Sequence, residues 1–406
     1  MLDDKLEAKG GTQMNAIPLV DMGDFESYAG PERLREVTPD TAGLAVTWDD
    51  GYQSRFHWIW LRDHCACAEC RHPATRERLF EVWATPLPLT PAEADIERGV
   101  LHLRWREPDG GEHVSLFDPA WLRRRAYDPM SRAGRERQRQ AWGAEMAERL
   151  PTFKYEKVRQ DKEVLAAWAD SLLWEGAALI RGAPAQAGEL ERFVDSVAPI
   201  YETHFGRIFD VQSKPNPNNA AYTSLPLEPH VDLPNHWAPP DIQLLFCIVN
   251  EAEGGDSTLV DGLKVTNDLR REVPEAFHIL SSRPIDFRFQ DEEVDIRCRV
   301  PVIELHSDGS FAGMRFNNWI RDSLDLPEED VEAFYKAYQE LWRALRDPEN
   351  CVKLRLDAGD ILAFDNRRVL HGRTGFTSSG SRHLQGCYLQ RSMLESRLRL
   401  LQRGSL

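Results

Sequence analysis

The most promising chemistry in this sequence comes from a histidine and a carboxylate two positions apart, in His230-Val231-Asp232. On a strand both side chains would point to the same face and could share one metal ion. His371 follows Asp232 by 371 − 232 = 139 residues and would complete a set of two histidines and one carboxylate. Such a set leaves three coordination positions open and suits Fe(II) chemistry with oxygen. The sequence therefore contains a candidate non-haem iron site.

A second His-x-Asp match, His306-Ser307-Asp308, shows how weak this pattern is by itself. It is followed by Gly309-Ser310 and lies between two runs that resemble strands. This context is typical of a hairpin tip. We therefore interpret His306 and Asp308 as a solvated turn.

Arg382 lies 11 residues beyond His371, on a run that can form the next strand. A guanidinium group can hold a carboxylate by two parallel hydrogen bonds, as a dicarboxylate co-substrate requires. A single histidine or arginine usually serves packing or surface pairing. The joint order of these residues nevertheless favours a site.

A second cluster consists of Cys65, Cys67 and Cys70, three thiols within six positions. In a reducing compartment such a cluster indicates metal binding rather than disulfides, and one tetrahedral ion would need a fourth ligand. On chemistry alone the candidates for that ligand are His64, His72, His102 and His113. A redox-active thiol pair is the alternative.

The composition limits the partners of the chain. Its 406 residues carry 50 Lys+Arg and 66 Asp+Glu, a net charge of −16, which argues against a nucleic-acid or anionic-membrane partner. The longest apolar stretch, residues 242–249, is far shorter than the roughly 20 residues of a membrane-spanning helix. The acidic, polar start of the chain does not resemble a secretory signal. We expect a cytoplasmic protein.

The pattern of apolar runs and turns predicts several parts. We expect an N-terminal extension at 1–40, a small β domain at 41–122 whose strands are separated by Asp-Gly turns, and a solvated, arginine-rich linker at 123–150. Residues 151–406 predict a β-rich domain with a few helices. The expected helices are 161–175, 188–197 and 327–345, and the expected strands are 176–180, 242–249, 299–305, 311–316, 360–364 and 383–390.

Four motifs in order carry a resemblance to a known family. They are His230-Val231-Asp232-Leu233-Pro234, Gly254-Gly255-Asp256-Ser257-Thr258-Leu259-Val260-Asp261-Gly262, Phe364-Asp365-Asn366-Arg367-Arg368-Val369-Leu370-His371-Gly372-Arg373 and Arg382-His383-Leu384-Gln385-Gly386-Cys387-Tyr388. With them the sequence resembles the γ-butyrobetaine dioxygenase branch of the Fe(II)/2-oxoglutarate oxygenases. The resemblance covers nearly the whole chain from about residue 42.

The resemblance implies a mainly β fold with flanking helices: a double-stranded β-helix (jelly-roll) catalytic domain and a small zinc-binding β domain at the N-terminal side. It implies three iron ligands: His230, Asp232 and His371. Arg382 would bind the distal carboxylate of 2-oxoglutarate, and either Ser257 or Thr258 would assist. It also selects His113 as the fourth ligand of a structural Zn(II), beside the three cysteines, and implies a homodimer.

In the resembled family the substrate is a small trimethylammonium zwitterion held among aromatic rings by cation–π attraction. The matching aromatic positions are Phe205, Phe209, Tyr222 and Tyr388. The anionic end of the substrate would lie near Asn219 and one of Asn317 and Asn318. Without the resemblance, the i, i+4 spacing of Phe205 and Phe209 favours a helix packed into a core.

The expected activity is hydroxylation of an unactivated C–H bond, most directly γ-butyrobetaine to carnitine, with O2 and 2-oxoglutarate as co-substrates. A close analogue such as 2-(trimethylamino)ethylphosphonate is the first alternative, since it presents the same cation. A non-enzymatic metal-bound interaction protein is a more remote one, and Arg382 argues against it. Because Asp232 keeps its carboxylate, halogenation is not expected.

Overall fold

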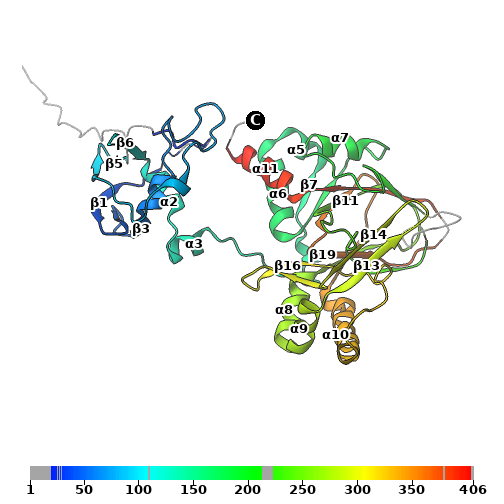
Figure 1. Cartoon of the computed structure of the whole chain (residues 1–406). Helices are drawn as coiled ribbons and strands as arrows, with labels where there is room; N and C mark the ends of the chain where they lie inside the picture. Colours follow the sequence, from blue (N-terminus) through cyan, green and yellow to red (C-terminus); the bar gives the residue numbers. More distant parts are fainter. Residues whose placement is uncertain are drawn as a thin grey trace, which may run out of the picture. The chain divides into compact units, whose positions relative to one another are not determined.

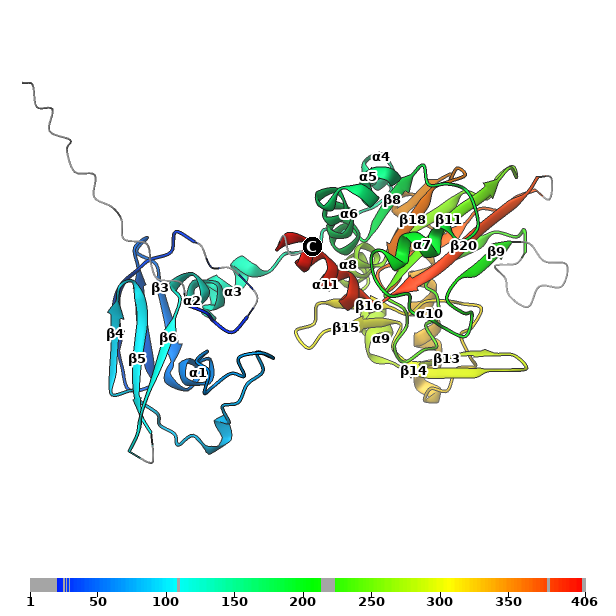
Figure 2. The ribbon, with the colours of Figure 1, turned by 90° about the horizontal axis from the view of Figure 1, so that it is seen from above.

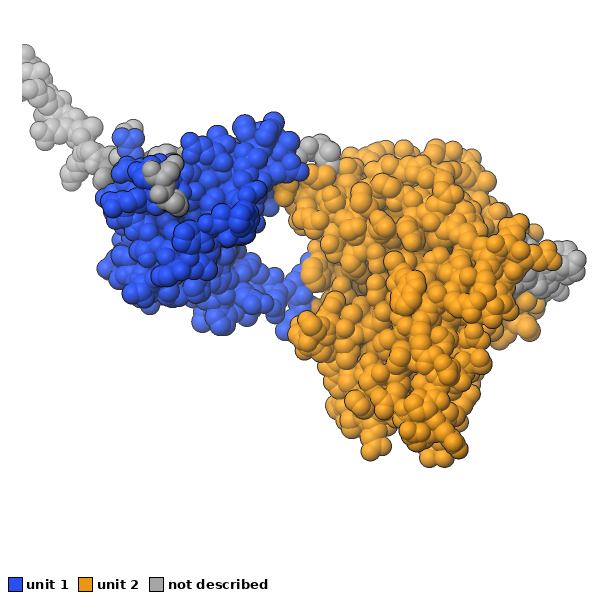
Figure 3. Space-filling model, viewed as in Figure 1, with its two compact units in different colours: residues 1–138 blue, residues 139–406 orange. Residues whose placement is uncertain are grey.

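The computed structural model describes residues 20–403 apart from 25, 27, 29, 108, 109, 213–222, 378 and 379. The chain divides into two compact units, Met1–Gln138 and Arg139–Leu406, coloured separately in Figure 3. The division falls inside the stretch predicted as a linker. Among the described residues no helix is long and apolar enough to cross a membrane.

The first unit contains two three-stranded antiparallel sheets. Their strands are β1 Leu34–Pro39, β2 Gly43–Trp48 and β3 Gln53–His57, and β4 Glu93–Glu97, β5 Val100–Arg106 and β6 Glu112–Phe117. Among the described residues of this unit, three helices and one 3-10 turn accompany them: α1 Trp58–Asp63, α2 Pro119–Arg125, α3 Pro129–Arg135 and η1 Val82–Ala84. Alternate residues of β5, Leu101, Leu103 and Trp105, enter one core. The first sheet already begins at Leu34, before residue 41.

The second unit is built on two larger sheets. One has the order β7-β8-β18-β11-β20-β9 and the other β10-β19-β12-β17. The strands of the six-stranded sheet are β7 Thr152–Lys154, β8 Ala177–Arg181, β18 Ile361–Asp365, β11 Ile242–Asn250, β20 Arg382–Leu389 and β9 Phe209–Gln212. Those of the four-stranded sheet are β10 Leu227–His230, β19 Val369–Arg373, β12 Ser257–Asp261 and β17 Cys351–Leu354.

Two hairpins and eight helices complete the second unit among the described residues. The hairpins are β13 Ile285–Gln290 with β14 Asp295–Val300, and β15 Ile303–Leu305 with β16 Phe311–Met314. The helices are α4 Met146–Arg149, α5 Tyr155–Gln160, α6 Lys162–Glu175, α7 Glu189–Asp195, α8 Gly262–Glu272, α9 Pro274–Ser282, α10 Glu328–Arg346 and α11 Arg391–Gln402, with the 3-10 turn η3 Pro348–Asn350. Figure 1 shows α8, α9 and α10 gathered beside the sheets.

The central strand β11 shows how the sequence separates the two faces of the six-stranded sheet. Ile242, Leu244 and Phe246 alternate along it and pack into a core with α6 and α11. Figure 2 shows these helices together at this sheet. The intervening Gln243 and Leu245 face the space between the sheets, and both line the cavity there. The two sheets on either side of this cavity confirm the expected double-stranded β-helix.

Two expectations about elements need correction. The run 299–305 is not one strand, since β14 ends at Val300 and β15 begins at Ile303. Pro301 lies between them and has no N–H group to continue a ladder. In the stretch expected to be solvated, Trp142 and Met146 are buried in the core of the second unit. The backbone N–H of Trp142 donates to Asp261 Oδ2 at 3.0 Å.

The hairpin at His306 matches the prediction. The backbone N–H of His306 donates to the oxygen of Ser310 at 2.8 Å, and Gly309 has a φ of +82° in the turn. His306 and Asp308 are both exposed at this tip. The second match is therefore a turn.

Candidate active site

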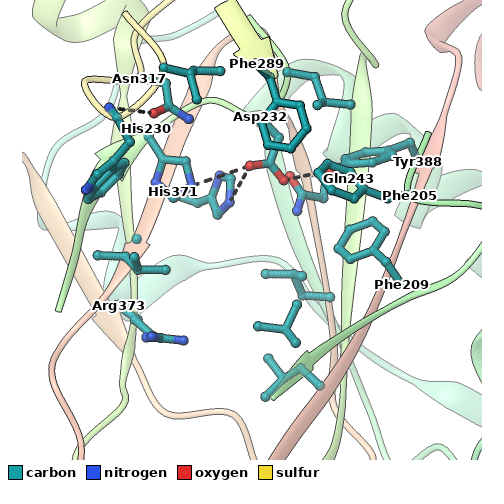
Figure 4. Close-up of a pocket in the computed structure, with 18 of the residues that line it drawn as sticks. Phe205, Phe209, His230, Asp232, Gln243, Phe289, Asn317, His371, Arg373 and Tyr388 are labelled. Atoms are coloured by element: carbon teal, nitrogen blue, oxygen red, sulfur yellow. Dashed lines mark hydrogen bonds and ion pairs between the residues drawn. The ribbon is translucent and has the colours of Figure 1, made fainter. Parts of the chain in front are cut away.

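The structure brings His230, Asp232 and His371 together, each offering a ligand atom within 4.8 Å of the others. Asp232 Oδ1 lies 3.4 Å from His230 Nε2 and 3.8 Å from His371 Nε2. Figure 4 shows the two imidazoles and the carboxylate pointing toward one another. This donor set is the one that leaves three positions open on Fe(II). The three side chains fit a single iron ion.

Strand pairing places the two histidines, because His230 on β10 is directly opposite His371 on β19. Their ring centroids are 4.3 Å apart. Asp232 is placed differently from the prediction, because β10 ends at His230 and Asp232 lies beyond the strand. The next residue, Leu233, has a φ of +55° and turns the chain. A turn, rather than strand alternation, therefore brings the carboxylate to the histidines.

The protonation of the cluster suits metal binding. Burial lowers the pKa of His371 to about 3, so its ring is neutral. His230 Nδ1 lies 2.9 Å from the Glu228 carbonyl oxygen. This oxygen can accept a hydrogen bond from Nδ1–H, which leaves the Nε2 lone pair free. Burial acts to raise the pKa of Asp232, but the charge that His371 and His230 carry in acid and the hydrogen bond from the Tyr388 hydroxyl outweigh it and hold that pKa below its usual range. Asp232 is therefore a carboxylate.

A cavity of about 450 Å³ opens beside the three ligands. Arg382 from β20 and Arg373 from β19 both line it. In the described part of the chain, the buried Nε of Arg382 has no hydrogen-bond partner, and its Nη2 lies 3.4 Å from the oxygen of Gly255. The ring of Phe376 lies beneath both guanidinium groups. Its centroid is 5.3 Å from Cζ of Arg382 and 4.9 Å from Cζ of Arg373. This end of the cavity fits an anionic group.

Strand alternation separates the two hydroxyl candidates on β12. Leu259 is opposite His371 and Ser257 is opposite Arg373, so Ser257 shares the face of these residues. Ser257 lines the cavity. Thr258 points to the other face, where its Oγ1 lies against Gly372. The geometry favours Ser257 over Thr258.

Aromatic rings form another wall of the cavity. Phe209 at the start of β9 is 5.0 Å from Tyr388 and 6.4 Å from Phe205, measured between ring centroids. Phe205 lies in a turn and Phe209 on a strand, so the alternative of one helix packed into a core is wrong. Phe289 on β13 adds a ring 5.8 Å from Phe205, visible in Figure 4.

The predicted amide residues are placed less favourably for binding an anion. Asn317 lines the cavity, but its amide donates to the Val231 oxygen at 3.3 Å and accepts from the backbone N–H of Trp319 at 3.1 Å. Asn318 is exposed. Asn219 and Tyr222 lie outside the described residues.

Several cavity residues were missed by sequence reasoning: Gln243, Phe289, Trp319 and Arg373. Gln243 is directly opposite Tyr388 in the pairing of β11 with β20, so a strand register would have found it. Trp319 stands edge-on to His230 at 5.3 Å and comes from a loop between β16 and α10. No local signal in the sequence identifies Phe289 or Trp319.

The cysteine cluster also forms a site, in the first unit. His113 Nε2 lies 3.3, 3.7 and 3.5 Å from the sulfur atoms of Cys65, Cys67 and Cys70. Ligands of a tetrahedral zinc ion, at about 2.0–2.3 Å from the metal, lie roughly 3.5 Å apart. The hydrogen bond between Cys65 and Cys70 lowers the pKa of Cys65 and raises that of Cys70, because two crowded sulfur atoms do not both lose their protons easily. The cluster fits a structural zinc site.

The surroundings of this cluster complement its charge. Arg62 Nη1 donates to Cys70 Sγ at 3.1 Å, and Arg62 is buried. Three thiolates and one Zn²⁺ carry a net charge of −1, which the guanidinium offsets. The Glu69 carboxylate lies 3.3 Å from His113 Nδ1 and can orient that ring.

Known protein families match both units of the chain. The model of the taurine catabolism dioxygenase TauD, TfdA family matches residues 134–388, and that of the gamma-butyrobetaine hydroxylase-like N-terminal domain matches residues 35–123. Gamma-butyrobetaine dioxygenase of Pseudomonas sp. (strain AK-1) is 38% identical over 387 residues, covering 94% of this chain and all of that protein. The human gamma-butyrobetaine dioxygenase is 34% identical, covering 88% and 94%. Trimethyllysine dioxygenase of Meyerozyma guilliermondii is 31% identical, covering 92% and 96%.

Fold, site and relatives together define a dioxygenase that depends on Fe(II) and 2-oxoglutarate. The chain belongs to the taurine catabolism dioxygenase TauD, TfdA family.

Proposed function

We propose that this enzyme hydroxylates γ-butyrobetaine to carnitine. The observation that carries the proposal is the aromatic wall of Phe205, Phe209, Phe289 and Tyr388 beside the two histidines and Asp232. Relatives named gamma-butyrobetaine dioxygenase, matched over most of the chain, support the same substrate.

In this proposal His230, Asp232 and His371 hold the iron. Arg382 holds the distal carboxylate of 2-oxoglutarate by charge-assisted hydrogen bonds, with Ser257 beside it. The buried, unpaired Nε of Arg382 supports its role, because burying a polar group without a partner costs free energy unless a ligand supplies one.

When bound, Fe(II) would supply the activation of O2. One oxygen atom of O2 would enter succinate as 2-oxoglutarate loses CO2, and the other would enter the substrate as a hydroxyl group. The residues of the chain bind and orient the reactants and exclude water. The aromatic rings would attract the trimethylammonium group by about 0.5–2 kcal/mol per well-placed ring. They would hold a carbon of the substrate near the metal without a covalent contact.

A substrate panel tests this proposal. Purified enzyme with Fe(II), 2-oxoglutarate and O2 is offered γ-butyrobetaine, 2-(trimethylamino)ethylphosphonate, trimethyllysine and taurine, and succinate and hydroxylated product are both quantified. We expect the highest kcat/KM for γ-butyrobetaine, with one succinate per hydroxylated product. A higher kcat/KM for any other member of the panel would replace the proposed substrate by that compound.

We further propose that the enzyme acts in the cytoplasm as a homodimer, with zinc as a structural ion in its first unit. No disulfide joins the cysteines in the described part of the chain, which suits a reducing compartment. The dimer follows from the family resemblance. Light scattering of the purified protein tests it, since a monomeric mass would contradict the proposal.

A further inference from the structure

The two carboxylate oxygens of Asp232 have different surroundings. Oδ1 faces the Nε2 atoms of His230 and His371 at 3.4 and 3.8 Å. Oδ2 accepts a hydrogen bond from the Tyr388 hydroxyl at 2.8 Å, drawn in Figure 4. Only one of the two oxygens is therefore directed at the point where the three ligands converge.

Tyr388 is also part of the aromatic wall. Its ring is buried and lies 5.0 Å from that of Phe209. The other described rings of the wall, Phe205, Phe209 and Phe289, are phenylalanines, and a phenyl face is sufficient for attraction to a cation. The wall therefore does not require the hydroxyl of Tyr388, and this hydroxyl donates a hydrogen bond to Asp232 instead.

Asn366 holds the backbone of the same residue. Its Oδ1 accepts from the N–H of Asp232 at 2.8 Å, and its Nδ2 donates to the oxygens of Asp232 and Pro240, both at 3.0 Å. Asn366 is almost completely buried. Leu233 follows with a φ of +55°, a conformation that a branched residue keeps only when its surroundings impose it. Asn366 is placed to impose it.

We propose that Tyr388 and Asn366 are positioning residues for Asp232, Tyr388 through the carboxylate and Asn366 through the peptide groups. The Tyr388 hydroxyl keeps Oδ2 engaged, so that Asp232 offers the metal one oxygen and leaves positions for 2-oxoglutarate and O2. The inference rests on the proposed function in one respect, since it gives Tyr388 a place in the substrate wall. That wall and the metal site would then share a residue.

The test begins with Tyr388→Phe, which keeps the ring and removes the hydroxyl. The affinity for Fe(II) is measured by anaerobic equilibrium dialysis, and kcat and KM by succinate formation with γ-butyrobetaine. We expect Fe(II) affinity and kcat each to fall about tenfold, the lower range for loss of a hydrogen bond to a metal ligand. The KM for γ-butyrobetaine should change by less than about twofold, because the ring remains.

A second variant, Asn366→Asp, tests the backbone contact independently. The aspartate keeps an acceptor for the Asp232 N–H but cannot donate to the two carbonyl oxygens, and its charge repels them. We expect Fe(II) affinity to fall about tenfold again. Tyr338→Phe and Asn350→Asp are the matched controls. Tyr338 is a buried tyrosine in α10, and Nδ2 of Asn350 donates to the Ala344 carbonyl oxygen at 2.9 Å.

The outcomes separate this inference from the proposed function. Wild-type Fe(II) affinity and kcat in Tyr388→Phe would overturn the role of the hydroxyl, and wild-type affinity in Asn366→Asp would overturn that of the amide. An equal loss of affinity in a control and its matched variant would reduce the effect to general destabilisation and overturn the inference. If the wild-type enzyme did not turn over γ-butyrobetaine, the proposed function would fail, while dialysis would still decide the positioning roles.

Discussion

Ser257 and Thr258 are neighbours on β12, yet only Ser257 shares the face of His371 and Arg373. We expect Ser257→Ala to raise the KM for 2-oxoglutarate about 10- to 100-fold, because a hydrogen bond to a charged group contributes about 1.5–3 kcal/mol. Thr258→Val should leave that KM unchanged. Succinate formation at varied 2-oxoglutarate measures both. A larger effect in Thr258→Val would show that the other face of the strand meets the co-substrate.

Phe289 allows a second test of a single side chain. Removing its ring by Phe289→Leu should raise the KM for γ-butyrobetaine by about 2- to 30-fold, the equivalent of 0.5–2 kcal/mol. The KM for 2-oxoglutarate should not change, since Phe289 packs against Phe205 and His204 rather than against Arg382. Initial rates at varied concentrations of each compound measure this. An unchanged KM for γ-butyrobetaine would exclude Phe289 from the substrate wall.

At the scale of the elements, Gly386 on β20 explains how a phenyl ring reaches the wall. It is directly opposite Phe209, and a Cβ atom at this position would lie 2.3 Å from the Cε2 and Cζ atoms of that ring. We expect Gly386→Ala to displace the ring and raise the KM for γ-butyrobetaine several-fold, up to about 30-fold. The KM for 2-oxoglutarate serves as the internal control. Equal increases in both would indicate a distorted β20 instead.

The elements themselves were largely predictable where local patterns are strong. The expected strand at 242–249 corresponds to β11, and the expected helix at 327–345 to α10, because continuous apolar runs and an apolar helix face are local signals. The turn at Leu233 was not predictable, since the side chain that holds the adjoining backbone of Asp232 belongs to Asn366, 134 residues from Asp232 along the chain. The prediction therefore grouped Asp232 with the two histidines, as the structure does, but placed it on a strand instead of in the turn that follows β10.

Each of the two compact units contains, among its described residues, a group of side chains that could hold a metal ion. Zinc binding by Cys65, Cys67, Cys70 and His113 would contribute directly to folding of the small first unit. We expect a strong chelator, or Cys70→Ser, to make residues 35–123 sensitive to a protease while residues 139–403 stay intact. Mass spectrometry of the fragments measures this. Protection of both units after the zinc is removed would contradict a structural role.

The sequence predicted this organisation only in part. Strand-like runs separated by Asp-Gly turns predicted the small β unit, and the arginine-rich stretch predicted the region in which the two units are divided. Burial of Trp142 in the second unit depends on contacts with Glu175 and Asp261, which no local pattern reveals. The aromatic wall likewise unites residues from separate strands and loops, so that family resemblance, rather than spacing, identified its members on β9 and β20.

In the proposed enzyme, His230, Asp232 and His371 hold Fe(II) while Arg382 holds the far end of 2-oxoglutarate. The most direct test is an anaerobic crystal structure of the complex with both, with the iron located by its anomalous scattering. We predict an iron peak between the Nε2 atoms of the two histidines and Oδ1 of Asp232, with the distal carboxylate of 2-oxoglutarate on Arg382. An iron peak elsewhere would contradict the proposed iron ligands, and a distal carboxylate away from Arg382 would contradict the proposed site of 2-oxoglutarate.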